Sequence, residues 1–220
     1  MKGLLVVAAA ACAAVMAAAA PAAAGGECRS LPICVPVAGP WVLTGAHEVE
    51  FQLACPRKFV IGGLDADISM RGIAVGFRGT LGAPINPGIT TTTSVVFLGR
   101  VVRAGPQVPS FRPRIGCIPG GGGQRVPTAA GVAPPGLPRM TQLAVLPGVQ
   151  RFIFRCPPKQ TLAAATHAIG FYLPAPPTAQ LAGSVHVEQA ISNGRVYVTV
   201  RGAPEIHSVR AIVQIDLLCA

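Results

Sequence analysis

Two stretches of the chain decide its fold: Val-Glu-Phe-Gln-Leu-Ala-Cys-Pro at residues 49–56 and Arg-Phe-Ile-Phe-Arg-Cys-Pro at residues 151–157. Each follows a turn that contains glycine and ends in Cys-Pro. From Val49 to Cys55 every second residue is apolar or cysteine, with Glu50 and Gln52 between them. Because side chains alternate between the two faces of a strand, this pattern predicts a strand whose buried face includes the cysteine.

The recurrence of the pattern predicts an all-β protein with two tandem, disulfide-stapled, immunoglobulin-like β-sandwich modules. The two copies have nearly equal spans, since Cys55 to Cys117 is 62 residues and Cys156 to Cys219 is 63. A single sandwich fused from both copies is the structural alternative. We expect four segments after the leader: an N-terminal segment at 25–40, the first module at 41–118, a Gly/Pro-rich linker at 119–139 and the second module at 140–220.

The composition supports strands and excludes other classes. Hydrophobic residues make up 51% of the 220 residues and charged residues 12%, which excludes intrinsic disorder and a coiled coil. The 26 glycines and 22 prolines disfavour long helices, because both residues break them.

The N-terminus predicts export. Lys2 precedes an apolar run that ends in Ala22-Ala23-Ala24, which is the pattern of a signal peptide cleaved near Ala24 (residues 1–24). An uncleaved anchor and a lipid-modified Cys12 are the alternatives. We expect a secreted or extracytoplasmic protein with no transmembrane segment in the mature chain.

Loss of the leader leaves six cysteines, an even number that indicates three disulfides in an exported protein. Cys55 and Cys219 both lie on the apolar face of their strands, as a bridge between two sheets requires. We therefore predict the disulfides Cys55–Cys117, Cys156–Cys219 and Cys28–Cys34.

Near the C-terminus, Asn193-Gly194 is a strong signal for a two-residue hairpin turn. It predicts that Ile191 pairs with Val196 on the inner face and that His186 pairs with Arg201 on the outer face. In the last strand every second residue up to Cys219 is apolar, which places Asp216 on the solvent side.

A strand ending in Cys-Pro, then Gly62-Gly63, then a strand ending in cysteine resembles small modules of bacterial secreted proteins. Those modules carry a Cys-Pro…Gly-Gly…Cys-Ala pattern, and Cys219-Ala220 matches its end. The second copy departs from it, with Ala163-Ala164 in place of Gly-Gly. The resemblance implies export and a β fold, and it implies no reaction.

No nucleophile elbow, phosphate-binding loop, zinc motif or calcium loop is present in the sequence. The only tight acidic pair is Asp65 and Asp67, which we interpret as part of a polar turn. A Ser-His-Asp triad can be assembled only from scattered residues, with Ser94 or Ser184 and Asp216. We expect no enzymatic activity, no cofactor and no metal site.

Charge is the strongest functional hint. The chain has 18 basic and 8 acidic residues, a formal net charge of +10, and most of the basic residues are arginine, which binds phosphate and carboxylate groups through a planar fork. The sequence thus favours a non-catalytic surface or envelope-associated module that binds an anionic envelope polymer or glycan, and not nucleic acid, because aromatic residues for base stacking are few. A secreted hydrolase and a carrier of a small apolar ligand are the alternatives, and a composition typical of a GC-rich genome also explains the charge. The candidate contacts are the arginines that the alternation along each strand places on the solvent-facing side: Arg112, Arg114, Arg151, Arg155, Arg195 and Arg201.

Overall fold

The computed structural model describes residues 26–79, 89–120 and 139–220, and these ranges are dominated by strands. The expected all-β class is confirmed. The first half contains β1 (Val35–Ala38), β2 (Trp41–Leu43), β3 (Val49–Ala54), β4 (Phe59–Ile68), β5 (Ile73–Arg78), β6 (Ser94–Val101) and β7 (Ser110–Pro119). The second half contains β8 (Arg139–Ala144), β9 (Gly148–Arg155), β10 (Leu162–Phe171), β11 (Val185–Ser192), β12 (Arg195–Gly202) and β13 (Ala211–Cys219). Three short helical turns complete these ranges: η1 (Gly26–Cys28), α1 (Ala179–Ala182) and η2 (Pro204–Ser208).

Most strand pairings of the first half have a counterpart in the second, and the pairing of β1 with β7 does not. The first half has a three-stranded sheet in the order β3-β6-β5, and the second half has one in the order β9-β12-β11. Opposite these sheets, β4 pairs with β7 and β10 pairs with β13. β2 in the first half and β8 in the second each pair with the last strand of their half, β7 and β13. This correspondence supports the predicted tandem duplication, which itself stays a prediction.

Local irregularities recur at matching positions as well. The turn after each Cys-Pro places a lysine in the left-handed region, Lys58 and Lys159, each with φ of 72°. The register between the two long strands then shifts between Ile61 and Gly63 in the first half and between Leu162 and Ala164 in the second. The Gly-Gly and Ala-Ala pairs of the sequence therefore occupy the same bulge.

All three disulfides join the predicted cysteines: Cys28–Cys34, Cys55–Cys117 and Cys156–Cys219. The two long-range bridges have similar Cα–Cα distances, 5.7 and 5.8 Å. Each connects the end of the first strand of a three-stranded sheet to the end of the strand that closes that half.

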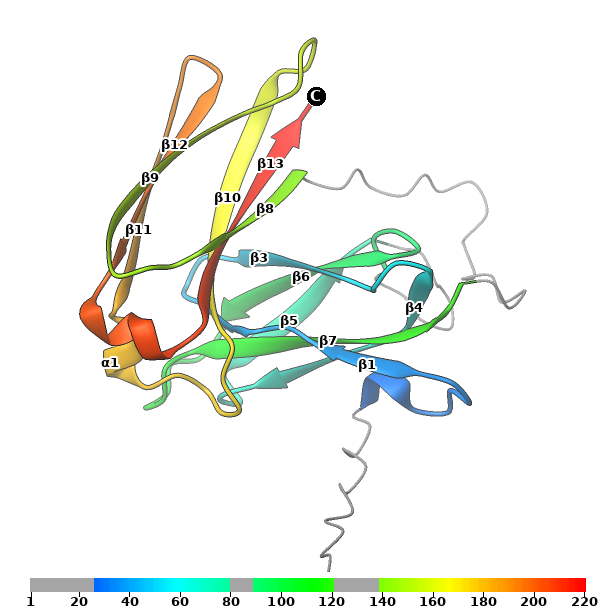
Figure 1. The fold of residues 1–220 in the computed structure, drawn as a ribbon. Coiled ribbons are helices and arrows are strands. Elements are labelled where there is room, and N and C mark those ends of the chain that lie inside the picture. Colours follow the sequence, from blue (N-terminus) through cyan, green and yellow to red (C-terminus); the bar gives the residue numbers. More distant parts are fainter. Residues whose placement is uncertain (1–25, 80–88, 121–138) are drawn as a thin grey trace, which may run out of the picture.

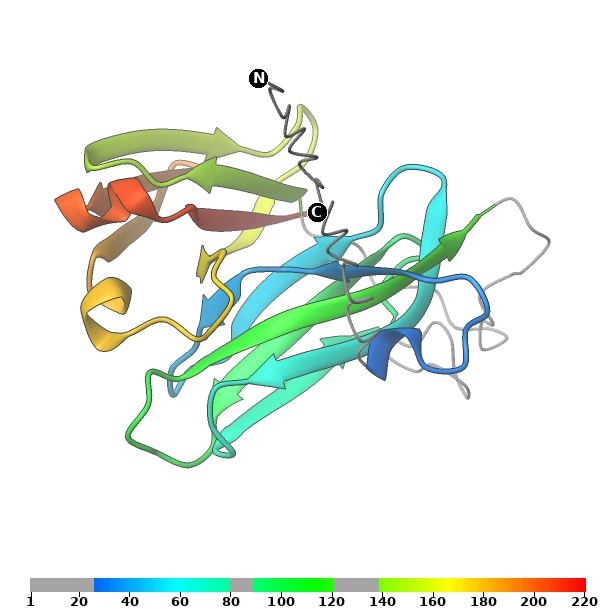
Figure 2. The same ribbon diagram turned by 60° about the horizontal axis from the view of Figure 1, so that its bottom comes forward.

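Each half has a hydrophobic cluster, and the cluster of the first half also includes Ala168 and Ile212 of the second. Phe51, Phe97 and Ile115 are central to the first, and Phe171, Val198 and Val213 to the second. The halves are nevertheless joined, because β2 pairs with both β7 and β10 and so makes one seven-stranded sheet in the order β1-β7-β2-β10-β13-β8, with β4 beside β7. Figures 1 and 2 show the two halves side by side.

The structure bears on the expected segment boundaries. β1 lies in the expected N-terminal segment 25–40 and pairs with β7, so this segment is part of the first half. Pro119 ends β7 and Arg139 begins β8, while residues 121–138 of the expected linker lie outside the described residues. The expected signal peptide, residues 1–24 with Cys12 and Ala24, also lies outside them.

The outward placement predicted for Asp216 is wrong. Its strand alternates as expected, but Gln214 and Asp216 are 0% and 2% exposed. Asp216 meets the first half, since it borders the same small cavity as Glu50 and Arg78, and Gln52 of β3 is also buried. Both faces of β13 are therefore buried, and the second burial is against the other half.

Candidate functional site

The outer face of the β9-β12-β11 sheet carries the largest group of predicted arginines. β12 lies in the middle and pairs along its whole length with both neighbours. Val196, Val198 and Val200 of β12 point into the core and are at most 1% exposed. The residues between them face outward, in four cross-strand rows: Arg155–Arg195–Ser192, Ile153–Tyr197–Ala190, Arg151–Thr199–Glu188 and Val149–Arg201–His186.

The hairpin turn sets this arrangement. Asn193 and Gly194 have φ values of 51° and 67°, which is the conformation of the predicted two-residue turn. All the hairpin pairs expected from the sequence are present, including Ile191 with Val196 and His186 with Arg201. Because register fixes which face a side chain occupies, this turn determines that Arg195 lies outside.

The first row places two like charges side by side. Arg155 is directly opposite Arg195, and side chains paired in this way have Cβ atoms about 4.5–5.5 Å apart. Like charges at such positions destabilise a sheet. Ser192, the third residue of the row, brings no negative charge to offset the two guanidinium groups.

The other rows differ in charge. Arg201 forms an exposed ion pair with Glu188, with 3.6 Å between Nη2 and Oε2. Within the described ranges, Arg151, Arg155 and Arg195 form no ion pair. The second row is apolar and open, with Ile153 60% and Tyr197 37% exposed. The face thus combines free guanidinium groups with an exposed apolar row.

Arg112 and Arg114 lie elsewhere and are held by the protein itself. The Nη2 group of Arg114 donates to Oε1 of Glu27 at 2.8 Å, and its Nη1 group donates to Oδ2 of Asp67 at 3.2 Å. The hydrogen bond to Glu27 is the main cause that raises the pKa of Arg114 above its usual value. The Nε group of Arg112 donates to the Gly39 carbonyl at 3.1 Å.

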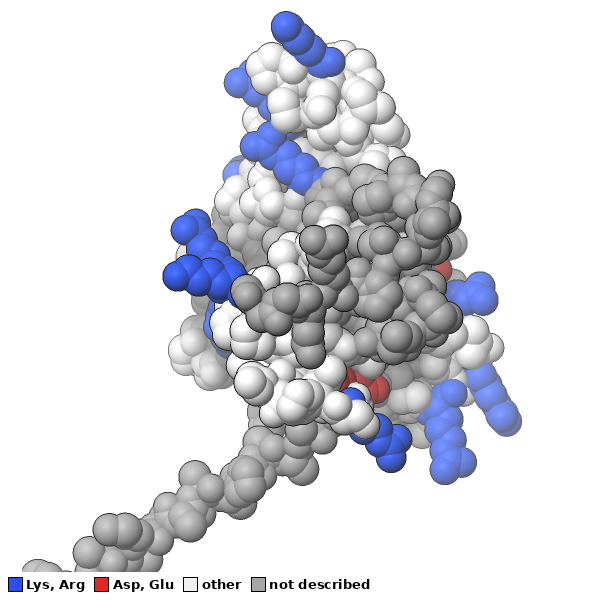
Figure 3. All heavy atoms as spheres, turned by 90° about the vertical axis from the view of Figure 1, so that its right-hand side faces the viewer, with Lys and Arg blue, Asp and Glu red and all other residues white. Residues whose placement is uncertain are grey.

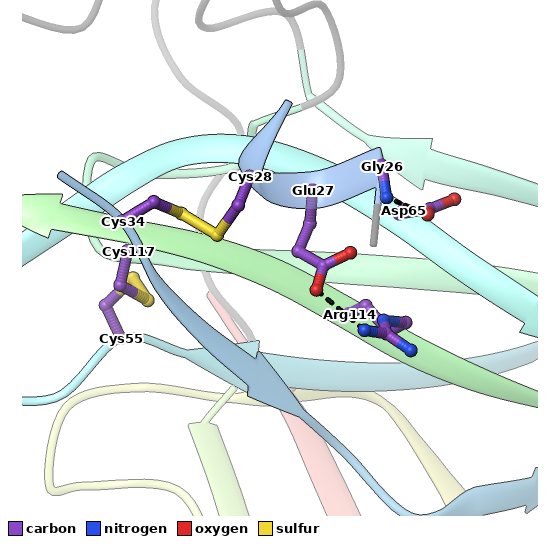
Figure 4. Close-up of a disulfide and its surroundings, with 8 residues drawn as sticks. All are labelled: Gly26, Glu27, Cys28, Cys34, Cys55, Asp65, Arg114 and Cys117. Carbon is purple, nitrogen blue, oxygen red and sulfur yellow. Dashed lines mark hydrogen bonds and ion pairs between the residues drawn. A yellow bond between two sulfur atoms is a disulfide. The ribbon is translucent and has the colours of Figure 1, made fainter. Parts of the chain in front are cut away.

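The segment formed by η1 and the Cys28–Cys34 disulfide, here called the N-terminal latch, lies across the outer face of β4 and β7. Figure 4 shows that Arg114 of β7 contacts this latch. Glu27 is 1% exposed and points at Arg114. The latch needs glycine beneath it, because a Cβ atom on Gly63 or Gly116 would collide with the Glu27 carbonyl group. The second half carries Ala164 and Leu218 at the corresponding paired positions.

Asp65 and Asp67 form hydrogen bonds that hold the same latch in place. They lie in β4 and not in a turn as interpreted from the sequence. Asp65 Oδ2 accepts a hydrogen bond from the Gly26 amide at 3.0 Å, and Asp67 pairs with Arg114. Among the described residues no group of three or more His, Cys, Asp or Glu side chains converges on a possible metal position.

Asp216 belongs to a polar cluster between the two halves that sequence reasoning missed. Its Oδ2 accepts from the Gln214 side-chain amide at 2.9 Å, while its buried Oδ1 has no partner within the described residues. It borders a small cavity of about 60 Å³ together with Thr166 and the Glu50–Arg78 ion pair of the first half. Burial raises the pKa of Asp216 to about 6, with Gln214 and the Arg78 charge acting in the opposite direction.

The residues considered for a hydrolytic triad are not brought together. Ser184 is buried and its Oγ donates to the Leu181 carbonyl at 2.6 Å. His167 Nδ1 lies 3.1 Å from the Gln189 side chain, and His207 Nδ1 lies 2.8 Å from the Pro204 carbonyl. No hydrogen bond between a serine and a histidine side chain is present in residues 26–79, 89–120 and 139–220.

Two larger depressions lie at loops and not between the sheet layers, where an apolar ligand would be carried. One, of about 550 Å³, is bordered by Trp41, the 106–108 loop and residues 176–179. The other, of about 430 Å³, lies between residues 144–147 and 206–211.

Basic side chains are also found away from the β9-β12-β11 sheet. Figure 3 shows the side that is on the right in Figure 1, where Lys and Arg side chains project along the margins. Net charge alone therefore does not locate a site.

No family model, no curated protein and no solved structure matches the chain. No helix in the described part of the chain is long and apolar enough to span a bilayer.

Proposed function

We propose that this protein is an exported, non-catalytic interaction module that binds anionic polymers of the cell envelope through the outer face of β9-β12-β11. The sheets serve as a rigid scaffold, and the exposed guanidinium groups make the contacts. The three disulfides fit an extracytoplasmic compartment, since such bonds persist in oxidising environments. The predicted leader, cleaved near Ala24, would direct the chain there.

The observation that carries the proposal is the pairing of Arg155 with Arg195. Two guanidinium groups opposite each other on an exposed face repel, and this repulsion is relieved when an anion binds between them. Arg151, two rows along the same face, extends the positive surface, so a linear polyanion can engage more than one row.

The proposal predicts salt-dependent binding to immobilised anionic polymers and to bacterial envelope fractions. Exposed ion pairs are weakened by salt, so binding should fall steeply as ionic strength rises. The test variant is Arg155→Glu/Arg195→Glu. Since an exposed ion pair is worth ~0.2–1 kcal/mol, losing two attractions and adding two repulsions should weaken binding by about tenfold or more.

The matched control is Arg100→Glu/Arg103→Glu, which changes net charge equally at two exposed positions of the first half. Binding by both double variants at the level of the unmodified protein would refute the proposal. An equal loss in both would show that net charge, and not this face, drives binding.

A further inference from the structure

We infer that the face is selective for phosphate ester groups carried on a glycan, over carboxylates at equal charge density. This inference rests on the proposed function and names its ligand. It follows from two adjoining rows, Arg155–Arg195–Ser192 and Ile153–Tyr197–Ala190.

The first row fits a tetrahedral anion. A single arginine fork satisfies a carboxylate, because the two oxygens and the two N–H donors lie in one plane. The two forks of Arg155 and Arg195 come from neighbouring strands and need acceptor oxygens in more than one plane. A phosphate ester has those oxygens, and as a monoester it carries a charge of about −1.5 to −2 at pH 7, which matches two arginines. The Ser192 hydroxyl provides one further donor.

The second row fits the carrier of the phosphate. Ile153 and Tyr197 are exposed and bear no charge, and they lie two residues along the strands from the arginines, about 7 Å away. A sugar ring next to a phosphate ester spans a similar distance. An aromatic ring with an exposed face gives a sugar an apolar surface and keeps its own hydroxyl group available to water. A purely inorganic polyanion would make no use of this row.

Arg201 is a contrasting case on the same face. Its charge is already paired with Glu188, and the register places it three rows away from Arg155 and Arg195. Selectivity should therefore depend on the Arg155–Arg195 pair and little on Arg201.

The experiment compares one polymer bearing three different groups. Dextran carrying phosphate, carboxymethyl or sulfate groups, at matched charge per sugar, is titrated against the full chain with its disulfides formed. The phosphate derivative should bind about tenfold more tightly than the carboxymethyl derivative, since two charge-assisted bidentate contacts replace one.

The decisive variant is Arg155→Lys/Arg195→Lys, which keeps the charge and removes both forks. It should retain salt-dependent binding to the dextrans while its preference for phosphate over carboxymethyl falls to near unity. Arg100→Lys/Arg103→Lys, the matched control, should keep the preference. A second variant, Tyr197→Ser, should weaken binding to dextran phosphate and leave binding to inorganic polyphosphate unchanged.

Failure of the inference and failure of the proposed function give different results. Equal binding of phosphate and carboxymethyl dextrans, or a preference that survives the lysine variant, overturns the inference and leaves the proposed function intact. Binding to none of the dextrans overturns both. Binding only to vesicles of phosphatidylglycerol also overturns both, and assigns the face to a membrane surface.

Discussion

Replacing Asp216 by asparagine should stabilise the protein at neutral pH and leave its stability unchanged in acid. Asp216 lies between the two halves, with one carboxylate oxygen bonded to Gln214 and the other without a partner in the described residues. The amide of Asp216→Asn has nearly the same shape, and its oxygen can still accept the hydrogen bond from Gln214.

The magnitude follows from the pKa. Burial raises the pKa of Asp216 from 3.8 to about 6. Since each pKa unit corresponds to about 1.4 kcal/mol, ionisation of Asp216 costs the folded state about 3 kcal/mol at neutral pH.

The sign is set by the proton count. Between pH 4 and pH 6 the folded protein holds a proton that the unfolded chain has lost, so the free energy of unfolding falls as pH rises through this window. Above pH 6 the decrease in the free energy of unfolding is complete and no longer changes with pH. The variant lacks this titration, so its advantage should be near zero at pH 4 and about 3 kcal/mol at pH 7.5.

The assay is urea unfolding from pH 4 to pH 8 with all disulfides intact, followed by tryptophan fluorescence. The single tryptophan, Trp41, is buried in β2, the strand that joins the halves. Glu205→Gln, which removes an exposed carboxylate, is the control and should change little. A difference between variant and unmodified protein that does not vary with pH would refute the reasoning, as would a variant that is less stable at pH 7.5.

Two further predictions concern the N-terminal latch. Arg114→Ala should lower the free energy of unfolding by about 3–5 kcal/mol, because it leaves the buried Glu27 carboxylate without its ion pair; Arg100→Ala, at an exposed position, should cost little, and similar losses from both in urea unfolding would contradict this assignment. Gly116→Ala should displace the latch, because the added Cβ would collide with the Glu27 carbonyl group, while Gly76→Ala adds a Cβ whose nearest neighbour is 4.0 Å away. Hydrogen exchange at the amides of residues 26–38 should increase only in the Gly116 variant, and unchanged protection there would show that the latch does not depend on this glycine.

Much of each half could be predicted from the sequence, because its strands obey a period of two and its cysteines fall on the buried faces. The register of the β11–β12 hairpin followed from Asn193-Gly194 alone. Prediction failed where a polar face is buried by a partner distant in the chain. Glu27, Gln52 and Asp216 carry the pattern of solvent-exposed residues, and no local periodicity indicates what covers them.

The positions of the candidate arginines were predicted in part for the same reason. The alternation of side chains along the strands correctly placed Arg151, Arg155, Arg195 and Arg201 on one exposed face. The same alternation also gave Arg114 an outward position, but the sequence did not indicate that η1 would cover that face. Gly63 and Gly116 were the available signal, since the latch requires a residue without Cβ at both positions.

The outer faces of the corresponding strands β3 and β9 have different surroundings. In the first half, Glu50 of β3 lies at the junction with β10 and β13 of the second half, and Gln52, on the same face of β3, is buried. At the same distance before the Cys-Pro, the second half carries Arg151 and Ile153, which are exposed.

The outer faces of the two halves differ: η1 covers β4 and β7 of the first half, whereas exposed charged side chains alternate with Ile153 and Tyr197 on β9 and β12 of the second. Repeat arrays need polar outer faces on their terminal units to prevent further stacking. Such a cap tolerates either sign of charge, because glutamate prevents the stacking of another unit as well as arginine does. An anion-binding face requires arginine. Arg155→Glu/Arg195→Glu therefore separates the two roles: a cap predicts unchanged oligomeric state and unchanged polymer binding, whereas the proposed function predicts unchanged oligomeric state with polymer binding weakened about tenfold or more.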